Sequence, residues 1–119
     1  MNALSPILSQ FASAPLLSSL MRFFSNIGVV PSALWMRFPV VRDFEVAVDN
    51  TSIIRYQSTI GDGIGRRLYW GGLKCYEPEV IGPFTKLAKN SKCFWDVGAN
   101  TGLFSLIAAE LMDGDIYAF

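Results

Sequence analysis

The feature that most constrains the fold of this chain is the succession of apolar segments around a glycine-containing turn at residues 93–119. Residues 93–97 form a short run of β-favouring residues, and residues 98–102 begin and end with glycine. Residues 103–112 are apolar almost throughout, and residues 115–119 form a second short apolar run. This order predicts strand, turn, buried helix and strand, with the two strands parallel and joined by a right-handed crossover. We therefore expect an α/β fold.

The turn at residues 96–102 is the candidate binding site. Gly98 and Gly102 permit a sharp turn and the close approach of a ligand to the backbone, and the following helix presents N–H groups at its start. Ligands of open α/β sheets bind outside the carboxyl ends of the strands, which is where this turn lies. Asp96 has two interpretations: it accepts hydrogen bonds from a ligand ammonium group, or it fixes the turn by bonding the backbone.

The spacing of the turn argues against two well-known phosphate-binding loops. A dinucleotide-binding loop requires Gly-x-Gly-x-x-Gly, but Asn100 and Leu103 occupy its second and third glycine positions. A P-loop ends in Gly-Lys followed by Ser or Thr, whereas Leu103 follows Gly102 directly. The turn therefore favours a ligand with an adenosine and a small zwitterionic tail over NAD or ATP.

Upstream of this unit, residues 43–70 are predicted to form short strands. Residues 44–48 and 52–57 have strand-like patterns on either side of a turn at Asp49 and Asn50. Residues 61–65 are a glycine-rich loop that resembles a nucleotide-binding loop. A nucleotide-binding loop leads into a helix, whereas we expect a short strand at residues 66–70 directly after this loop. A hairpin loop is therefore the favoured interpretation of residues 61–65.

A helix is predicted from Pro78 to about residue 89. Proline favours the first helical position, and Glu77 and Glu79 complement the positive end of the helix dipole. Gly82 and Pro83 interrupt the pattern, which predicts a kink or two short turns. Glu77 has a second interpretation, because an acidic residue just before the first strand can reach the cofactor end of such a sheet.

Residues 1–42 are predicted to form a helical extension. Residues 1–21 carry no charge but contain two prolines and several serines, which disfavours both a secretory signal and a membrane span. A helix is expected from about Ser13 to about Gly28. Its apolar stripe either packs on the domain or makes a peripheral membrane contact through residues 14–27. The stripe consists of Leu16, Leu20, Phe24 and Ile27.

Composition excludes several classes of function. Ten basic and ten acidic residues give a formal net charge of zero, so no nucleic-acid partner is expected. Histidine is absent, which excludes a Ser-His-Asp relay and a His-ligated zinc ion within this chain, and no metal site is predicted. Cys75 and Cys93 are predicted to be reduced, half-buried thiols of a cytoplasmic protein, since a disulfide requires an oxidising compartment.

Residues 94–105, together with residues 116–119, resemble the FkbM-type family of S-adenosylmethionine-dependent methyltransferases. The resemblance lies in Asp-Val-Gly-Ala-Asn at residues 96–100 and in Tyr-Ala-Phe at residues 117–119, and residues 76–79 resemble the segment that leads into that domain. The resemblance implies a Rossmann-like methyltransferase fold of which only the first strand–helix–strand unit is present. Residues 43–119 would then be the N-terminal part of the domain, truncated after its second core strand.

By this resemblance, the turn would hold the methionine part of S-adenosylmethionine, and the methyl group would pass to an oxygen of an unidentified small-molecule, glycan or lipid acceptor. The glutamate that grips the ribose would lie about 20 residues beyond the turn, just past Phe119. We therefore assign no catalytic residue and expect the fragment to be inactive alone. The positions expected to bind the cofactor are Asp96, Gly98, Ala99, Asn100, Thr101, Gly102 and, in its second interpretation, Glu77.

The alternative function is a non-catalytic binding or scaffold module. One strand–helix–strand unit cannot bury both faces of its own sheet, so such a module would need a partner to cover its apolar surface.

Overall fold

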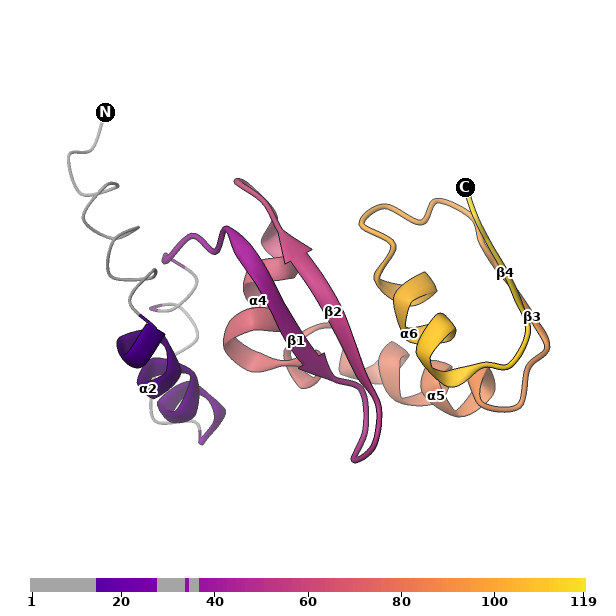
Figure 1. Cartoon of the computed structure of the whole chain (residues 1–119), viewed down its shortest axis with the longest axis horizontal. Helices are drawn as coiled ribbons and strands as arrows, with labels where there is room; N and C mark the ends of the chain where they lie inside the picture. Colours follow the sequence, from indigo (N-terminus) through magenta and orange to yellow (C-terminus); the bar gives the residue numbers. More distant parts are fainter. Residues whose placement is uncertain (1–14, 28–33, 35–36) are drawn as a thin grey trace.

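The structure is a computed structural model that describes residues 15–27, 34 and 37–119. Figure 1 shows α2, an antiparallel hairpin and a parallel strand pair following one another along the longest axis. The described residues form a compact mixed α/β globule with four α-helices and two small two-stranded sheets. In chain order the elements are α2 (Pro15–Asn26), β1 (Arg42–Ala47), β2 (Ile53–Ser58), α4 (Gly63–Gly71), the 3₁₀ turn η1 (Leu73–Cys75), α5 (Pro78–Ala88), β3 (Cys93–Asp96), α6 (Leu103–Leu111) and β4 (Asp115–Ala118).

The hairpin of β1 and β2 confirms both predicted strands. The two strands are antiparallel, and Phe44 lies opposite Tyr56. Both aromatic side chains are buried while the residues on either side of them are exposed, as the alternation of a half-buried strand requires. Asp49 forms the turn, because its Oδ1 accepts hydrogen bonds from the backbone N–H groups of Thr51 and Ser52, both at 2.8 Å.

Helix α4 corrects two predictions. The strand expected at residues 66–70 is helical, and a helix does follow the glycine-rich loop, so the hairpin-loop interpretation of residues 61–65 is wrong. Asp62 caps the helix, since its Oδ1 accepts a hydrogen bond from the backbone N–H of Gly65 at 2.8 Å. Gly65 also lies against β2, where a Cβ atom would collide with the Ser58 side chain. The cap and this close packing together favour a helix over the predicted strand.

Helix α5 begins at Pro78, as predicted, and runs as one continuous helix with Pro83 inside it. Of the two predicted outcomes, two short turns is therefore wrong, and a kink at Gly82 and Pro83 stays a prediction. Ile81 and Ala88 are buried on its inner face, and Phe84 stacks edge-on against Phe104 of α6, with 5.0 Å between ring centroids. These contacts bury the inner face of the helix and offset the hydrogen bond that an internal proline removes.

The carboxyl-terminal unit confirms the predicted strand, helix and strand. β3 and β4 pair in parallel, with Phe94 opposite Ile116, and α6 connects them. Leu103, Ile107 and Ala108 of α6 are buried. The helix is thus buried along one face against the rest of the fold, rather than all round.

One hydrophobic core joins the β1–β2 hairpin to α4, α5 and α6. Trp70 and Leu68 of α4 and Ile107 of α6 are completely buried within it. Tyr69 lies edge-on to both Trp70 and Phe44, with ring centroids 4.9 and 5.1 Å apart. The shared core fixes the position of α6, and with it the preceding turn, relative to the hairpin.

Helix α2 confirms the predicted helix, while the predicted cap at Ser13 lies outside the described residues. The apolar stripe is not what packs on the domain: Leu16 is 87% exposed and Ile27 is 54% exposed. Instead, Met21 lies against the core and the Arg22 guanidinium lies 4.7 Å from the centre of the Tyr69 ring. Among the described residues, no helix has the length and apolar character needed to cross a bilayer.

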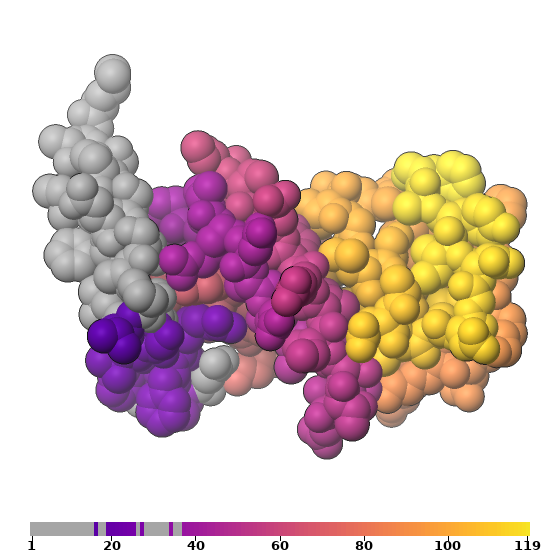
Figure 2. Space-filling view, viewed as in Figure 1, coloured from indigo at the N-terminus to yellow at the C-terminus, as the bar shows by residue number. Residues whose placement is uncertain are grey.

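The two cysteines differ from their predicted burial. Both are free thiols, but both are exposed rather than half-buried. Cys93 is the first residue of β3, and its sulfur lies 3.2 Å from Nε1 of Trp95, on the same outer face. Figure 2 shows the carboxyl-terminal unit at one end of the molecule and α2 at the other.

Candidate functional site

The turn after β3 has a backbone that only a few residue types adopt at low cost. Gly98, Asn100 and Gly102 have φ angles of +79°, +52° and +73°. Glycine populates this left-handed region freely, and asparagine is among the other residues that enter it most readily. The sequence of the turn therefore matches its conformation.

Hydrogen bonds hold the turn against the end of β4. The carbonyl oxygen of Phe119 accepts from the backbone N–H groups of Gly98 and Ala99, both at 3.0 Å, and the Phe119 N–H donates to the Asp96 carbonyl at 2.9 Å. Gly102 N–H donates to the Ala99 carbonyl at 2.8 Å and closes the turn. The turn thus lies at the carboxyl ends of both parallel strands, where ligands of α/β sheets bind.

Asp96 connects β3 to α6. Its Oδ2 accepts a hydrogen bond from the Ser105 hydroxyl at 2.6 Å. The carboxylate therefore holds the helix next to the turn, whereas the sequence predicted a bond to the turn backbone or to a ligand. An ionised carboxylate has about four acceptor positions, so one bond from Ser105 leaves capacity for a ligand ammonium group. Ser105 was missed because nothing in its local sequence pairs it with Asp96.

Helix α6 begins without a side-chain cap. Gly102 occupies the N-cap position and provides no side-chain hydrogen bond to the first helical turn. A Cβ atom placed on Gly98 or Gly102 would meet no other atom within 4 Å, so the space beside both glycines is open. Uncapped N–H groups at a helix start attract a carboxylate or another anion. The turn thus fits a ligand that carries a carboxylate and an ammonium group.

Glu77 occupies the position before α5 in the left-handed conformation, with φ of +42°. Its side chain is exposed and does not cap the helix. Within the described part of the chain, the structure contains no hydrogen bond or ion pair between Glu77 and the turn. The structure brings residues 96–102 together, and a cofactor role for Glu77 stays a prediction.

A second segment, which the sequence did not predict, reaches the turn. The Tyr56 hydroxyl donates to Oδ2 of Asp62 at 3.0 Å, and the Thr101 side chain lies near this hydroxyl. Burial raises the pKa of Tyr56, Thr101 opposes that rise, and the Asp62 carboxylate adds to it. Tyr56 therefore stays protonated at neutral pH. Recognising Asp62 as a helix N-cap would have singled out this residue from the sequence. The strand predicted at residues 66–70 left no helix there for Asp62 to cap.

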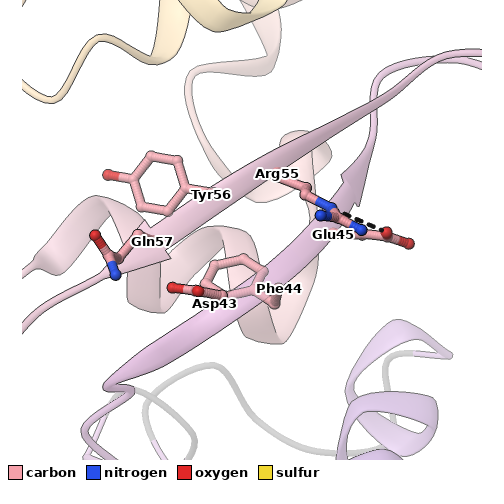
Figure 3. Close-up of a pocket in the computed structure, with 6 residues that line it drawn as sticks. All are labelled: Asp43, Phe44, Glu45, Arg55, Tyr56 and Gln57. Carbon is pink, nitrogen blue, oxygen red and sulfur yellow. Dashed lines mark ion pairs between the residues drawn. The ribbon is translucent and has the colours of Figure 1, made fainter.

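A hollow of about 420 Å³ lies on the hairpin itself (Figure 3). Figure 3 shows the ion pair between Arg55 and Glu45, whose Nε and Oε1 atoms are 3.6 Å apart, and the Tyr56 hydroxyl pointing away from Phe44. Both charged side chains are largely exposed, so this pair contributes little to stability.

A hollow of about 530 Å³ lies between the loop before α4 and the turn. Its volume falls within the range of about 300 to 1,000 Å³ found for small-molecule sites. The residues that line it are Tyr56, Gln57, Thr59, Ile60, Gly61, Asp62, Gly63, Ile64, Asn100 and Thr101.

The β3–β4 sheet has an exposed aromatic face. Trp95 is 63% exposed and Phe119 is 68% exposed, and the Trp95 ring lies 5.6 Å from Tyr117 and 5.9 Å from Phe119, between centroids. Parallel sheets are normally covered on both faces. The described residues cover only the face of this sheet that α6 occupies.

Comparisons with family models, with curated proteins and with solved structures each found no match to this chain. No group of three or more histidine, cysteine, aspartate or glutamate residues gathers in a metal-binding arrangement among the described residues.

Proposed function

We propose that the turn at residues 96–102 is the S-adenosylmethionine site of a methyltransferase of the FkbM type, with the Rossmann-like fold of that class. The observation that carries the proposal is the turn itself. Three of its residues have positive φ angles, it lies at the carboxyl ends of two parallel strands, and it leads into a helix that has no side-chain cap. This combination suits an uncharged backbone cradle for a zwitterionic amino-acid tail.

The residues of the turn have distinct parts to play in this proposal. Asp96 would accept the ammonium group of the methionine tail while Ser105 keeps its carboxylate in place. The open space beside Gly98 and Gly102 would let the ligand approach the backbone. S-adenosylmethionine supplies a methyl group activated by its sulfonium centre, and the protein contributes mainly by positioning the acceptor oxygen against it.

We propose further that the β3–β4 sheet is one part of a larger sheet. The support is the exposed aromatic face around Trp95 and Phe119, which an α/β fold covers with further elements. The chain alone is then expected to bind the cofactor weakly and to be inactive. The same exposed face supports the second candidate function, a binding or scaffold module whose partner covers it.

Titration of the 119-residue chain with S-adenosylhomocysteine, followed by amide NMR, tests the proposal. We expect the Gly98 and Gly102 amide signals to shift at millimolar ligand. Asp96→Asn keeps an acceptor for Ser105 but loses the carboxylate charge, and it should weaken binding about tenfold or more. Glu110→Gln removes an exposed acid from α6, the helix that follows the turn, and serves as the control.

Two results would count against the cofactor site. One is an absence of shifts in the turn at saturating ligand, which would favour the scaffold function. The other is equal affinity of the wild type and Asp96→Asn, which would remove Asp96 from the site.

A further inference from the structure

The hollow beside the turn is built from two segments that are distant in the sequence. The loop before α4 contributes Asp62 and its neighbours, and the turn contributes Asn100 and Thr101. Any small molecule in this hollow would therefore contact the residues of the proposed cofactor turn directly.

The floor of the hollow is fixed in place by hydrogen bonds. Tyr56 is only 3% exposed, and its hydroxyl donates to Asp62 and lies near the Thr101 side chain. Asp62 also accepts from the backbone N–H of Gly65, so its carboxylate orientation is set by two partners. Each carboxylate oxygen accepts about two hydrogen bonds, so Asp62 has remaining capacity toward the hollow.

The lining has a definite chemical character. Gln57 and Asn100 supply side-chain amides, Thr59 and Thr101 supply hydroxyls, and Asp62 supplies the one carboxylate in this lining. No lysine or arginine occurs among the described residues that line the hollow, so no side-chain cation there compensates the charge of a phosphate or carboxylate ligand. Amides, hydroxyls and a carboxylate suit ligand hydroxyl groups, which donate and accept at once. Ile60 and Ile64 add aliphatic contact.

We infer that this hollow is the acceptor subsite and that it takes an uncharged molecule rich in hydroxyl groups, such as a sugar ring. The inference rests on the proposed function, because the subsite has a purpose only beside a cofactor turn. Asp62, Gln57 and Asn100 are the residues that bind the acceptor hydroxyls. Tyr56 is a positioning residue, which holds the Asp62 carboxylate in place beside Thr101.

The experiment is an amide NMR titration with methyl α-glucopyranoside, in the presence and absence of S-adenosylhomocysteine. Glucose 6-phosphate, titrated separately, is the charged counterpart. We expect methyl α-glucopyranoside to shift the signals of Gln57, Asn100 and Thr101, and glucose 6-phosphate to bind more weakly. Asp62→Asn should weaken the sugar about tenfold or more, and it leaves the fold intact because asparagine also caps helices.

Two further variants provide a second test of the lining and a matched control. Gln57→Met tests the lining at an exposed position of β2 and should also weaken the sugar, even if Asp62→Asn is unstable. Glu45→Gln lies on the same hairpin but outside this hollow, and it should leave sugar binding unchanged.

The outcomes separate the two proposals. If S-adenosylhomocysteine shifts Gly98 and Gly102 but methyl α-glucopyranoside shifts nothing, the acceptor subsite is overturned and the cofactor site stands. If the sugar binds and S-adenosylhomocysteine does not, the proposed function is overturned, and the acceptor role with it. Preferential binding of glucose 6-phosphate would overturn the assignment of an uncharged ligand.

Discussion

Replacing Gly98 by alanine separates the conformation of the turn from its contact with a ligand. Gly98 has φ of +79°, and a Cβ atom there would meet no other atom within 4 Å. The change in folding stability therefore comes from the backbone alone, and a left-handed non-glycine residue costs about 1–2 kcal/mol. For a domain of this size, 1 kcal/mol lowers the midpoint of thermal unfolding by about 4 °C, so we expect a decrease of about 4–8 °C.

Gly72→Ala is the matched control. Gly72 ends α4 with φ of +66°, also with no atom within 4 Å of a Cβ position, and it does not belong to the turn. It should lose at least as much stability as Gly98→Ala. Only Gly98→Ala places a methyl group in the open space beside the turn, where overpacking against a bound ligand costs about 1–3 kcal/mol. Its affinity for S-adenosylhomocysteine should therefore fall about fivefold or more.

Thermal unfolding followed by circular dichroism measures the first effect, and NMR titration measures the second. A wild-type unfolding midpoint for Gly98→Ala would refute the left-handed conformation at residue 98. Equal losses of affinity in Gly98→Ala and Gly72→Ala would refute the site, because the weaker binding would then follow from general destabilisation.

Three other predictions concern the rest of the fold. Pro83→Ala restores the N–H that can bond the Glu79 carbonyl inside α5, and it should raise the free energy of unfolding in urea by up to about 3 kcal/mol; a decrease would contradict the loss of a helical hydrogen bond at Pro83. The Lys89 ammonium group, and to a smaller extent the backbone N–H groups of Thr51 and Ser52, hold the pKa of Asp49 well below its ordinary 3.8. The folding stability that this ionised carboxylate contributes is therefore present above about pH 3.8 and lost as the pH falls below it. Lys89→Ala should flatten this acid dependence of the unfolding midpoint, and an unchanged pH profile would exclude the ion pair as its cause. If residues 14–27 contact a membrane, Phe23→Asp should reduce co-flotation with anionic liposomes; absence of flotation by the wild type would remove this partner.

The elements that the sequence predicted correctly are those specified by local signals. Pro78 begins α5 because its missing N–H is not needed there, and Asp49 makes the hairpin turn through bonds to residues two and three positions away. The turn at residues 96–102 belongs to the same group, since its glycines and Asn100 match the φ angles observed. Each of these signals acts within a few residues, so it can be found without knowing the fold.

The apolar stripe of α2 shows what periodicity leaves open. The 3.6-residue pattern identified a helix correctly, but it did not identify the face that packs. Arg22 takes the position over the Tyr69 ring, and Met21 lies against the core beside it, while Leu16 and Ile27 stay exposed. A cation over an aromatic ring joins residues far apart in sequence, so the helix alone could not predict it.

Helix α4 links the main error in the fold to the main omission in the site. Residues 66–70 contain the aromatic residues typical of strands, and glycine at 65 is a poor helix former, so local propensity favoured a strand. Packing of Gly65 against Ser58 and capping by Asp62 reverse that preference. The same carboxylate that begins the helix also receives the Tyr56 hydroxyl beside Thr101. Predicting a strand at residues 66–70 thus removed the one reason to single out Asp62, because a strand needs no N-cap. The position of the Asp62 carboxylate in the lining of the hollow therefore depends on α4 being a helix.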